Sequence, residues 1–248
     1  MGFVNVSGTN IYYQPNAGHA NQGCLLYIHG SGSSHELWYN QMNLDTNSIA
    51  LDLPGHGRSS GTAASSIAQS AQTVADFLMA LQVPRPVYLV GHSMGAAIAL
   101  TCALNHPEVS DGIILIGSGQ RMKVLPSFLE DLHQGKSDPE FIRMGFSPQA
   151  PAALVDNMVK TFGEVSPSIL YADFSACNLF DVSAELEKIT LPVLIITGAD
   201  DKLTPLKLAQ YLSSHIANSR LQVISDAGHF AMLEKPDEIN QLIVDFCS

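Results

Sequence analysis

Short, almost uninterrupted apolar runs alternate along this chain with longer stretches of helical period, and this alternation restricts the possible folds more than any other feature. Runs with so few polar residues are typical of strands that are buried on both faces of a parallel sheet. Strands that alternate with helices indicate consecutive βα units. The sequence therefore predicts an α/β fold. The six core strands are expected at residues 24–29, 48–53, 87–91, 112–116, 192–197 and 221–225.

A turn composition near the N-terminus predicts two further strands. The segment SGTN at residues 7–10 separates two short apolar segments, 3–6 and 11–13. This pattern indicates an antiparallel hairpin, which we expect at one edge of the sheet. Apolar residues then recur at helical spacing after Ile67 and after Ser93, and again near the C-terminus. We expect these helices to cover the sheet.

Residues 118–190 interrupt the alternation. They contain no run typical of a strand, proline and glycine recur, and residues 128–133 and 152–162 have an amphipathic helical pattern. We predict that residues 1–117 and 191–248 form one core domain and that residues 118–190 form a helical cap inserted into it.

The charge balance excludes several classes of partner. Twelve Lys and Arg residues stand against twenty-three Asp and Glu residues, which gives a formal net charge of −11. Such a chain repels a phosphate backbone, so we expect neither nucleic acid nor an anionic membrane surface as a partner. The apolar runs are four or five residues long, whereas a membrane-spanning helix needs roughly twenty. The sequence indicates no oligomeric state.

The four cysteines predict a reduced environment. They are widely separated, form no C-x-x-C pair and have no histidine nearby at the spacing of metal ligands, so we expect no metal site. The first residues contain no basic segment followed by an apolar one, so we expect no export signal and a cytoplasmic protein. The cysteines are Cys24, Cys102, Cys177 and Cys247.

The pentapeptide GHSMG at residues 91–95 carries the strongest chemical signal. It directly follows a predicted strand and opens a predicted helix, which is the context that the G-x-S-x-G pattern requires. On such a turn a serine hydroxyl projects toward a helix N-terminus, where partial positive charge favours a developing anion. We therefore predict that Ser93 is a catalytic nucleophile.

A serine nucleophile requires a histidine base and an acid that orients it. His229 follows the last predicted strand, so it should lie at the same edge of the sheet as Ser93. Asp200 and Asp201 follow the strand at residues 192–197, and their spacing alone does not decide which of them orients His229. Because the base must be neutral to accept a proton, we expect activity to fall at low pH.

Acyl transfer also needs backbone N–H groups that bind the oxyanion. We expect one from Met94, the residue after the nucleophile, and one from Ser31 in the glycine-rich segment that follows the strand at residues 24–29. This segment has neither the P-loop lysine nor a G-x-G-x-x-G pattern, so we do not expect nucleotide binding.

Other residues near these donors are candidates for substrate contact. Gly30 and His92 stand beside the predicted oxyanion donors, and His35 and Trp38 follow the same glycine-rich segment. His35 and Trp38 line the substrate entrance in one interpretation and pack at the start of a helix in the other. The segment DLPGHGRS at residues 52–59 is interpreted as a structural turn.

Taken together, these motifs resemble the α/β-hydrolase fold superfamily over almost the whole chain. The resemblance implies an eight-stranded, mostly parallel sheet with helices on both faces and a helical cap between the sixth and seventh strands. It also implies Asp201 as the triad acid, because the family pattern Gly-x-x-Asp matches that residue, and it assigns the oxyanion amides to Ser31 and Met94. The matching segments are 29–30 (HG), 52–57 (DLPGHG), 91–95 (GHSMG), 198–205 (GADDKLTP) and 228–229 (GH).

From the ordered triad and the apolar composition of the predicted cap, we expect a serine hydrolase that cleaves small-molecule carboxylic esters of small to medium acyl chains through an acyl-enzyme. We expect no metal or organic cofactor, because no cluster of ligands appears and the nucleophile supplies the chemistry. Epoxide hydrolases and haloalkane dehalogenases of this superfamily use an aspartate nucleophile, so Ser93 argues against both. A lactonase, a thioesterase, a perhydrolase and a carbon–carbon bond hydrolase remain alternatives. A ligand-binding receptor on a hydrolase fold is the alternative that is not an enzyme.

Overall fold

The computed structural model describes residues 1–18 and 23–248, and its centre is one eight-stranded sheet with the order β1-β2-β4-β3-β5-β6-β7-β8. β1 and β2 form an antiparallel hairpin at one edge, β2 runs antiparallel to β4, and all further pairs are parallel. The strands are β1 (Gly2–Val6), β2 (Thr9–Asn16), β3 (Cys24–Ile28), β4 (Ser48–Leu51), β5 (Val87–His92), β6 (Gly112–Ile116), β7 (Val193–Gly198) and β8 (Ser219–Ile224).

The mostly parallel sheet and the edge hairpin predicted from the sequence are confirmed. Several strand boundaries differ from the predicted ones by one residue, and those of β2, β4 and β8 differ by two or more, with β2 longer than the predicted segment at both ends. β4 ends two residues before the predicted limit, because the chain turns away at Asp52. β8 begins at Ser219, two residues before the predicted start, and it alternates between partly buried and exposed residues. This alternation reflects its place at the edge of the sheet, where a continuous apolar run is not required.

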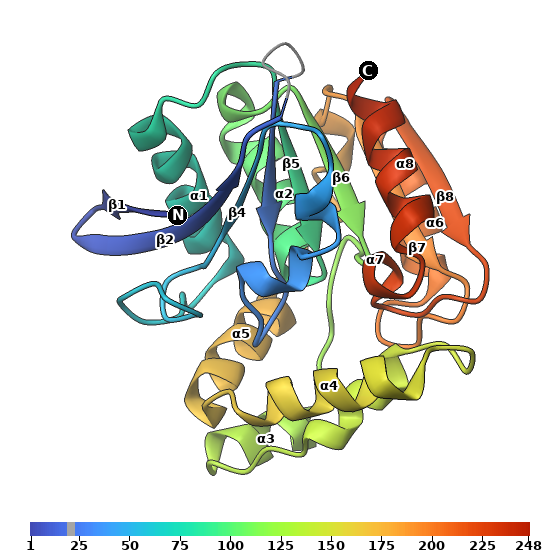
Figure 1. Ribbon diagram of the computed structural model, residues 1–248. Helices are drawn as coiled ribbons and strands as arrows, with labels where there is room; N and C mark the ends of the chain where they lie inside the picture. The colour runs from blue at the N-terminus through green and yellow to red at the C-terminus, as the bar shows by residue number, and fades with distance from the viewer. Residues whose placement is uncertain (19–22) are drawn as a thin grey trace.

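Helices cover both faces of the sheet (Figure 1). On one face α1 (Ile67–Leu81), α2 (Met94–Asn105) and α6 (Leu206–His215) pack on inward side chains of the strands. On the other face α8 (Pro236–Cys247) and a 3₁₀ helix at His35–Trp38 bury a second apolar cluster. Both faces of the central strands are therefore buried, as their continuous apolar runs predict.

Residues 118–190, called the cap segment below, contribute no strand to the sheet and contain three α-helices. Figure 1 shows these helices grouped beyond one end of the strands. The two ends of the segment meet, since Arg121 and Asp181 form an isolated antiparallel bridge and the Val182 N–H donates to Gln120 O at 2.9 Å. The helices of the segment are α3 (Pro126–His133), α4 (Ala152–Gly163) and α5 (Pro167–Leu179), together with a 3₁₀ helix at Pro139–Gly145. The short helix α7 (Ala231–Glu234) lies outside the segment.

Helix α5 was not among the helices predicted from the sequence. Its buried positions include Asp173 together with Leu170, Ala176 and Cys177, so no purely apolar face marks it. Across the residues that the structure describes, no helix combines the length and the apolar character needed to cross a membrane.

Helix α2 lies unusually close to the strands beneath it. A side chain at Gly91 would overlap the backbone of Gly95, and a side chain at Gly95 would overlap the carbonyl groups of Ile28 and His29. The two glycines of the G-x-S-x-G segment are therefore required by packing between β3, β5 and α2. This contact fixes where the helix begins.

We predict that Gly95→Ala lowers the free energy of unfolding by about 1–3 kcal/mol, because the added methyl group overlaps backbone atoms that cannot rotate away. Urea unfolding monitored by circular dichroism measures the change. The matched control is Gly163→Ala at the end of α4, where the new Cβ would lie 3.4 Å from its nearest neighbour, an ordinary contact. Equal stability of the two variants would contradict the packing argument.

Candidate active site

Ser93 lies on a strained turn between β5 and α2. Its backbone has φ 53° and ψ −114°, in the left-handed region that residues with a side chain rarely adopt. The turn is held by hydrogen bonds from Ser93 N to Ile116 O at 2.9 Å and from Ala96 N to Ser93 O at 3.0 Å. Ser93 is partly exposed, although His92 and Met94 on either side of it are buried.

The structure pairs His229 with Asp201. His229 Nδ1 lies 2.9 Å from Asp201 Oδ2, and both side chains are buried. Asp200 instead donates its N–H to Ala227 O at 2.9 Å. Of the two aspartates that the spacing left open, Asp201 is thus the one that contacts His229.

The Asp201 carboxylate is held by three further hydrogen bonds. Its Oδ1 accepts from the N–H groups of Leu203 at 2.9 Å and Thr204 at 2.8 Å, and its Oδ2 accepts from the Thr204 hydroxyl at 2.6 Å. Burial by itself raises the pKa of Asp201, but the charge of His229 and the hydrogen bonds from His229 and Thr204 outweigh burial and lower that pKa. The carboxylate is therefore ionised and accepts the Nδ1–H of His229, which leaves Nε2 as the basic nitrogen.

His229 lies directly against the turn that carries Ser93. His92 Nε2 donates to His229 O at 3.1 Å, and the two imidazole rings are 4.7 Å apart between centroids. Burial and the neighbouring His229 lower the pKa of His92 well below its ordinary value, so His92 is a neutral donor. Gly117 makes room for His229, because a Cβ at this position would lie 3.0 Å from His229 Nδ1. The structure thus brings Ser93, Asp201 and His229 to one end of the sheet.

The two predicted oxyanion donors lie side by side. The Ser31 hydroxyl contacts Met94 Sδ at 3.6 Å, and a Cβ at Gly30 would lie 3.2 Å from Ser93 Cβ and 3.0 Å from His92 Nδ1. Within the described residues, neither the Ser31 N–H nor the Met94 N–H donates to another group of the protein. Both amides remain available to an acceptor that does not belong to the chain.

His35 and Trp38 form the packed 3₁₀ helix that was the alternative interpretation. Trp38 is fully buried and its ring lies 4.9 Å from that of Tyr27. His35 donates its N–H to Asp52 Oδ1 at 2.7 Å and its ring nitrogen Nδ1 lies 2.8 Å from the same oxygen. These contacts serve packing, and a role in lining the substrate entrance stays a prediction for both residues.

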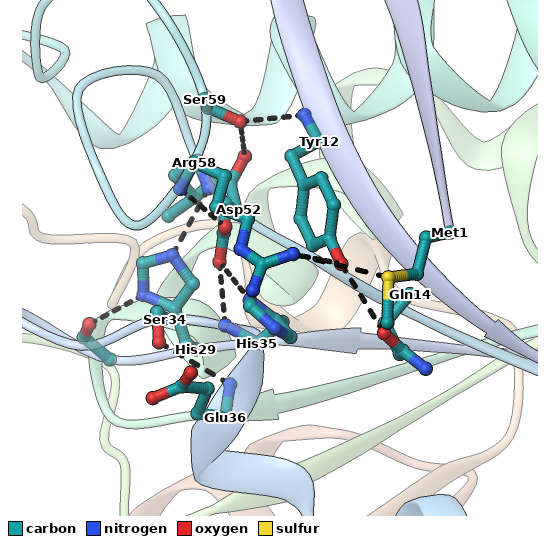
Figure 2. A network of polar contacts seen from close by, with 12 residues as sticks. Met1, Tyr12, Gln14, His29, Ser34, His35, Glu36, Asp52, Arg58 and Ser59 are labelled. Atoms are coloured by element: carbon teal, nitrogen blue, oxygen red, sulfur yellow. Dashed lines mark hydrogen bonds and ion pairs between the residues drawn. The ribbon is translucent and has the colours of Figure 1, made fainter.

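Asp52 is the centre of a polar network beside the glycine-rich segment after β3 (residues 29–34, called the oxyanion segment below), as Figure 2 shows. Besides His35, its carboxylate accepts the Arg58 N–H at 2.8 Å, and its carbonyl accepts the Ser59 hydroxyl at 2.7 Å. His29 joins this network from β3, accepting the Leu53 N–H at 3.1 Å through Nε2 and lying 2.8 Å from Gly30 O through Nδ1. The segment at residues 52–59 is a structural turn, as interpreted from the sequence.

Sequence reasoning missed several groups that position the site. Thr204 follows Asp201 by three residues, a spacing typical of local side-chain to backbone hydrogen bonds, and this signal was available. Gly117 and Glu234 gave no such signal. The Glu234 carboxylate accepts the Gly228 N–H at 2.9 Å and the Ser147 N–H at 3.0 Å, and so joins the His229 loop to the cap segment.

The structure offers no obvious place for a metal ion. Over residues 1–18 and 23–248, no three His, Cys, Asp or Glu side chains are grouped as metal ligands. The sequence-based expectation of a reaction without a metal stays a prediction.

The chain is similar to known proteins over most of its length. A family model for the alpha/beta hydrolase family matches residues 25–242. The uncharacterized hydrolase YugF of Bacillus subtilis is 30% identical over 97% of this chain and 95% of its own length. A pimeloyl-(acyl-carrier protein) methyl ester esterase of Yersinia enterocolitica is 28% identical over 90% of this chain and 92% of its own. The solved structure of a thermophilic esterase has a TM-score of 0.86 at 32% identity, covering 98% of this chain and 95% of its own.

We predict that Asp201→Asn lowers the free energy of unfolding at pH 7 by about 1–3 kcal/mol, through loss of charged hydrogen bonds. The pKa of Asp201 is lower in the folded chain than in the unfolded one. The carboxylate therefore stabilises the fold above the unfolded pKa of about 3.9, and this contribution is lost as pH falls through the lower folded value.

Urea unfolding at pH values from 7 downward measures the difference between the two proteins. The difference should be constant above about pH 5 and shrink below about pH 4. Asp200→Asn, next along the chain, is the matched control for removal of a carboxylate, because Asp201 and not Asp200 contacts His229. A gap between wild type and Asp201→Asn that stays the same at every pH would contradict the assignment of Asp201 as an ionised carboxylate held by these hydrogen bonds.

Proposed function

The chain belongs to the alpha/beta hydrolase family and is a hydrolase, and we propose that it cleaves carboxylic esters of small to medium acyl chains through Ser93, His229 and Asp201. The observation that carries this proposal is the buried 2.9 Å contact between His229 Nδ1 and Asp201 Oδ2, directly beside the strained turn at Ser93. A histidine held in this tautomer presents Nε2 as a base, which is what a serine nucleophile requires.

In the first half of the proposed reaction, Ser93 Oγ attacks the ester carbonyl carbon while His229 Nε2 takes the hydroxyl proton. Asp201 stabilises the imidazolium that forms. The carbonyl oxygen becomes an oxyanion and accepts hydrogen bonds from the N–H groups of Ser31 and Met94. The tetrahedral intermediate then collapses, the imidazolium protonates the departing alkoxide, and Ser93 is left acylated.

In the second half, water enters in place of the alcohol. His229 Nε2 removes a proton from this water as its oxygen attacks the acyl carbonyl carbon. The same two amides bind the second oxyanion. When the bond to Ser93 Oγ breaks, the proton on His229 returns to the serine and the carboxylic acid leaves. No other group is needed to balance the protons.

Apolar side chains of the cap segment support a small or medium acyl group as the substrate. Phe162 and Leu170 reach the oxyanion segment, where a side chain at Gly32 would overlap Leu170 and lie 2.9 Å from Phe162. On the other side of the site, Phe146 stacks on Phe230 with ring centroids 4.7 Å apart. We propose that the cap segment is a separate helical insertion that walls the acyl site over a core of residues 1–117 and 191–248.

The partner that this site fits is a small ester molecule. Gly30 and His92, which lie against Ser93, are proposed to contact the reacting ester group.

The three buried cysteines are free thiols, which supports the proposal of a reduced, cytoplasmic setting.

We predict that Ser93→Ala and His229→Ala each reduce kcat on p-nitrophenyl acetate by roughly 10⁴-fold or more, and that the double variant loses little more, because the triad acts as one unit. Steady-state kinetics on folded proteins measures this. Ser127→Ala, an exposed serine in α3, is the control and should retain wild-type activity. Losses that multiply in the double variant would rule out a shared mechanism.

We predict turnover of p-nitrophenyl and methyl esters of short to medium acyl chains in preference to acyl thioesters, lactones and carbon–carbon bond substrates. A panel of these substrates, compared by kcat/KM, separates the esterase from the lactonase, thioesterase and carbon–carbon hydrolase. A fluorophosphonate probe should label Ser93 and leave Ser93→Ala unlabelled. A chain that turns over no member of the panel and resists the probe would be a binding protein on a hydrolase fold.

A further inference from the structure

A carboxylate of the cap segment is hydrogen bonded to the backbone of the oxyanion segment. Asp173 of α5 is only 2% exposed, and its Oδ2 accepts the Gly32 N–H at 2.8 Å. Gly32 directly follows Ser31 and has φ +63°, so this hydrogen bond holds the peptide group immediately after the one that carries the Ser31 N–H. The same Oδ2 lies 2.9 Å from His56 Nε2.

The partners of His56 define its charge. Its Nδ1 lies 3.0 Å from Pro54 O, and a carbonyl oxygen can only accept a hydrogen bond. Its Nε2 faces the Asp173 carboxylate, which also accepts. Both ring nitrogens therefore carry protons, and His56 with Asp173 forms a buried ion pair. Burial lowers the pKa of His56, but the hydrogen bond and charge of Asp173 outweigh burial and raise it.

The other ionisable groups around His56 agree with this charge. The His29 ring, from the end of β3, lies 4.9 Å from the His56 ring between centroids. Burial and the His56 charge lower the pKa of His29 to about 3, so His29 is neutral. Asp52, at the end of β4, adds a favourable charge to His56, and His35 of the 3₁₀ helix contacts Asp52 rather than His56.

We propose that Asp173 and His56 are positioning residues that hold the Ser31 amide in place from the cap segment. The inference rests on the proposed function, because the Ser31 amide is one of the two proposed oxyanion donors. The ion pair joins three segments that are distant in sequence: α5, the turn at residues 52–59 and the glycine-rich segment after β3. Neither residue touches the reacting atoms, so their effect reaches the reaction through the backbone at Ser31 and Gly32.

The ion pair between His56 and Asp173 is expected to be lost at alkaline pH. Because the pKa of His56 is raised by folding, the ion pair is fully formed below the unfolded pKa of about 6.5 and is lost as pH rises through the higher folded value. Neutral His56 would keep the Nε2–H that it donates to the Asp173 carboxylate and would lose the Nδ1 proton that faces Pro54 O, so the positive charge of the pair is lost. Asp173, which accepts the Gly32 N–H, would then lose the positive charge of its partner and be held less firmly. We therefore expect kcat to fall as pH rises above the folded pKa of His56.

The first experiment does not depend on activity. Amide hydrogen exchange at Gly32 and ¹⁵N spectra of the His56 imidazole are recorded at pH 7 for wild type, Asp173→Asn and Asp173→Ala. The matched control is Asp156→Asn, an exposed carboxylate of α4 in the same cap segment. Wild type and control should show a doubly protonated His56 and a protected Gly32 amide. Asp173→Asn should show neutral His56, and Asp173→Ala should exchange the Gly32 amide at least about tenfold faster.

The second experiment measures kinetics on p-nitrophenyl acetate, with active sites counted by fluorophosphonate. Asp173→Ala should lower kcat by roughly 10- to 100-fold with little change in KM, because a displaced donor acts mainly in the transition state. In Asp173→Asn, His56 is expected to be neutral, so no unpaired charge is buried. The kcat of this variant should not fall at alkaline pH as the kcat of wild type does. An unchanged kcat per labelled site together with an unchanged pH profile would overturn the proposal.

The two experiments separate this inference from the proposed function. If wild type hydrolyses no ester and takes no fluorophosphonate, the esterase assignment fails, while Gly32 exchange and the His56 spectra still decide whether the ion pair holds the segment. A neutral His56 in wild type, or Gly32 exchange unaffected in both Asp173 variants, would reject the inference even in an active esterase.

Discussion

The contact between α2 and the strands β3 and β5 sets the geometry of the whole carboxyl end of the sheet. It depends on the absence of side chains at Gly91 and Gly95, which lets helix and strand backbones meet directly. With the helix so close, the connection at Ser93 can only be a sharp turn with positive φ. Met94, the first residue of α2, then lies beside Ser31, whose hydroxyl is 3.6 Å from Met94 Sδ. Packing of main chain against main chain thus positions both the proposed nucleophile, Ser93, and one proposed oxyanion donor, Met94.

Four buried histidines surround this turn, and their partners give each a different state. His29 and His92 are neutral, since burial and a neighbouring imidazole lower the pKa of each. His56 is charged, since it donates from both nitrogens. His229 donates through Nδ1 to Asp201 and keeps Nε2 as its basic nitrogen. Neutral histidines, a charged histidine and a proposed catalytic base thus lie within the same group of loops. Their states differ because each ring contacts a different set of hydrogen-bond acceptors.

The sequence predicted the parts of this structure that depend on local pattern. Strands buried on both faces are visible as apolar runs, and the turn at residues 91–95 is visible because its glycines and serine are adjacent. The role of Asp173 could not be predicted, because it depends on contacts with Gly32 and His56 that lie far away in sequence. The sequence left two places open for Trp38, the substrate entrance and a packed helix start. Its full burial against Tyr27 depends on a contact between separate segments that no short sequence pattern shows.

The backbone at Ser93 sets a limit on how far this protein can be stabilised. A residue with a side chain in that conformation costs of order 1–3 kcal/mol, which the surrounding contacts must overcome. Glycine would adopt the same conformation without strain, so a chain optimised for stability alone would have glycine at position 93 and would lose the hydroxyl. Any engineering effort that ranks substitutions by folding energy will therefore favour replacing the residue on which the proposed chemistry depends. Stability and activity are in direct opposition at this position.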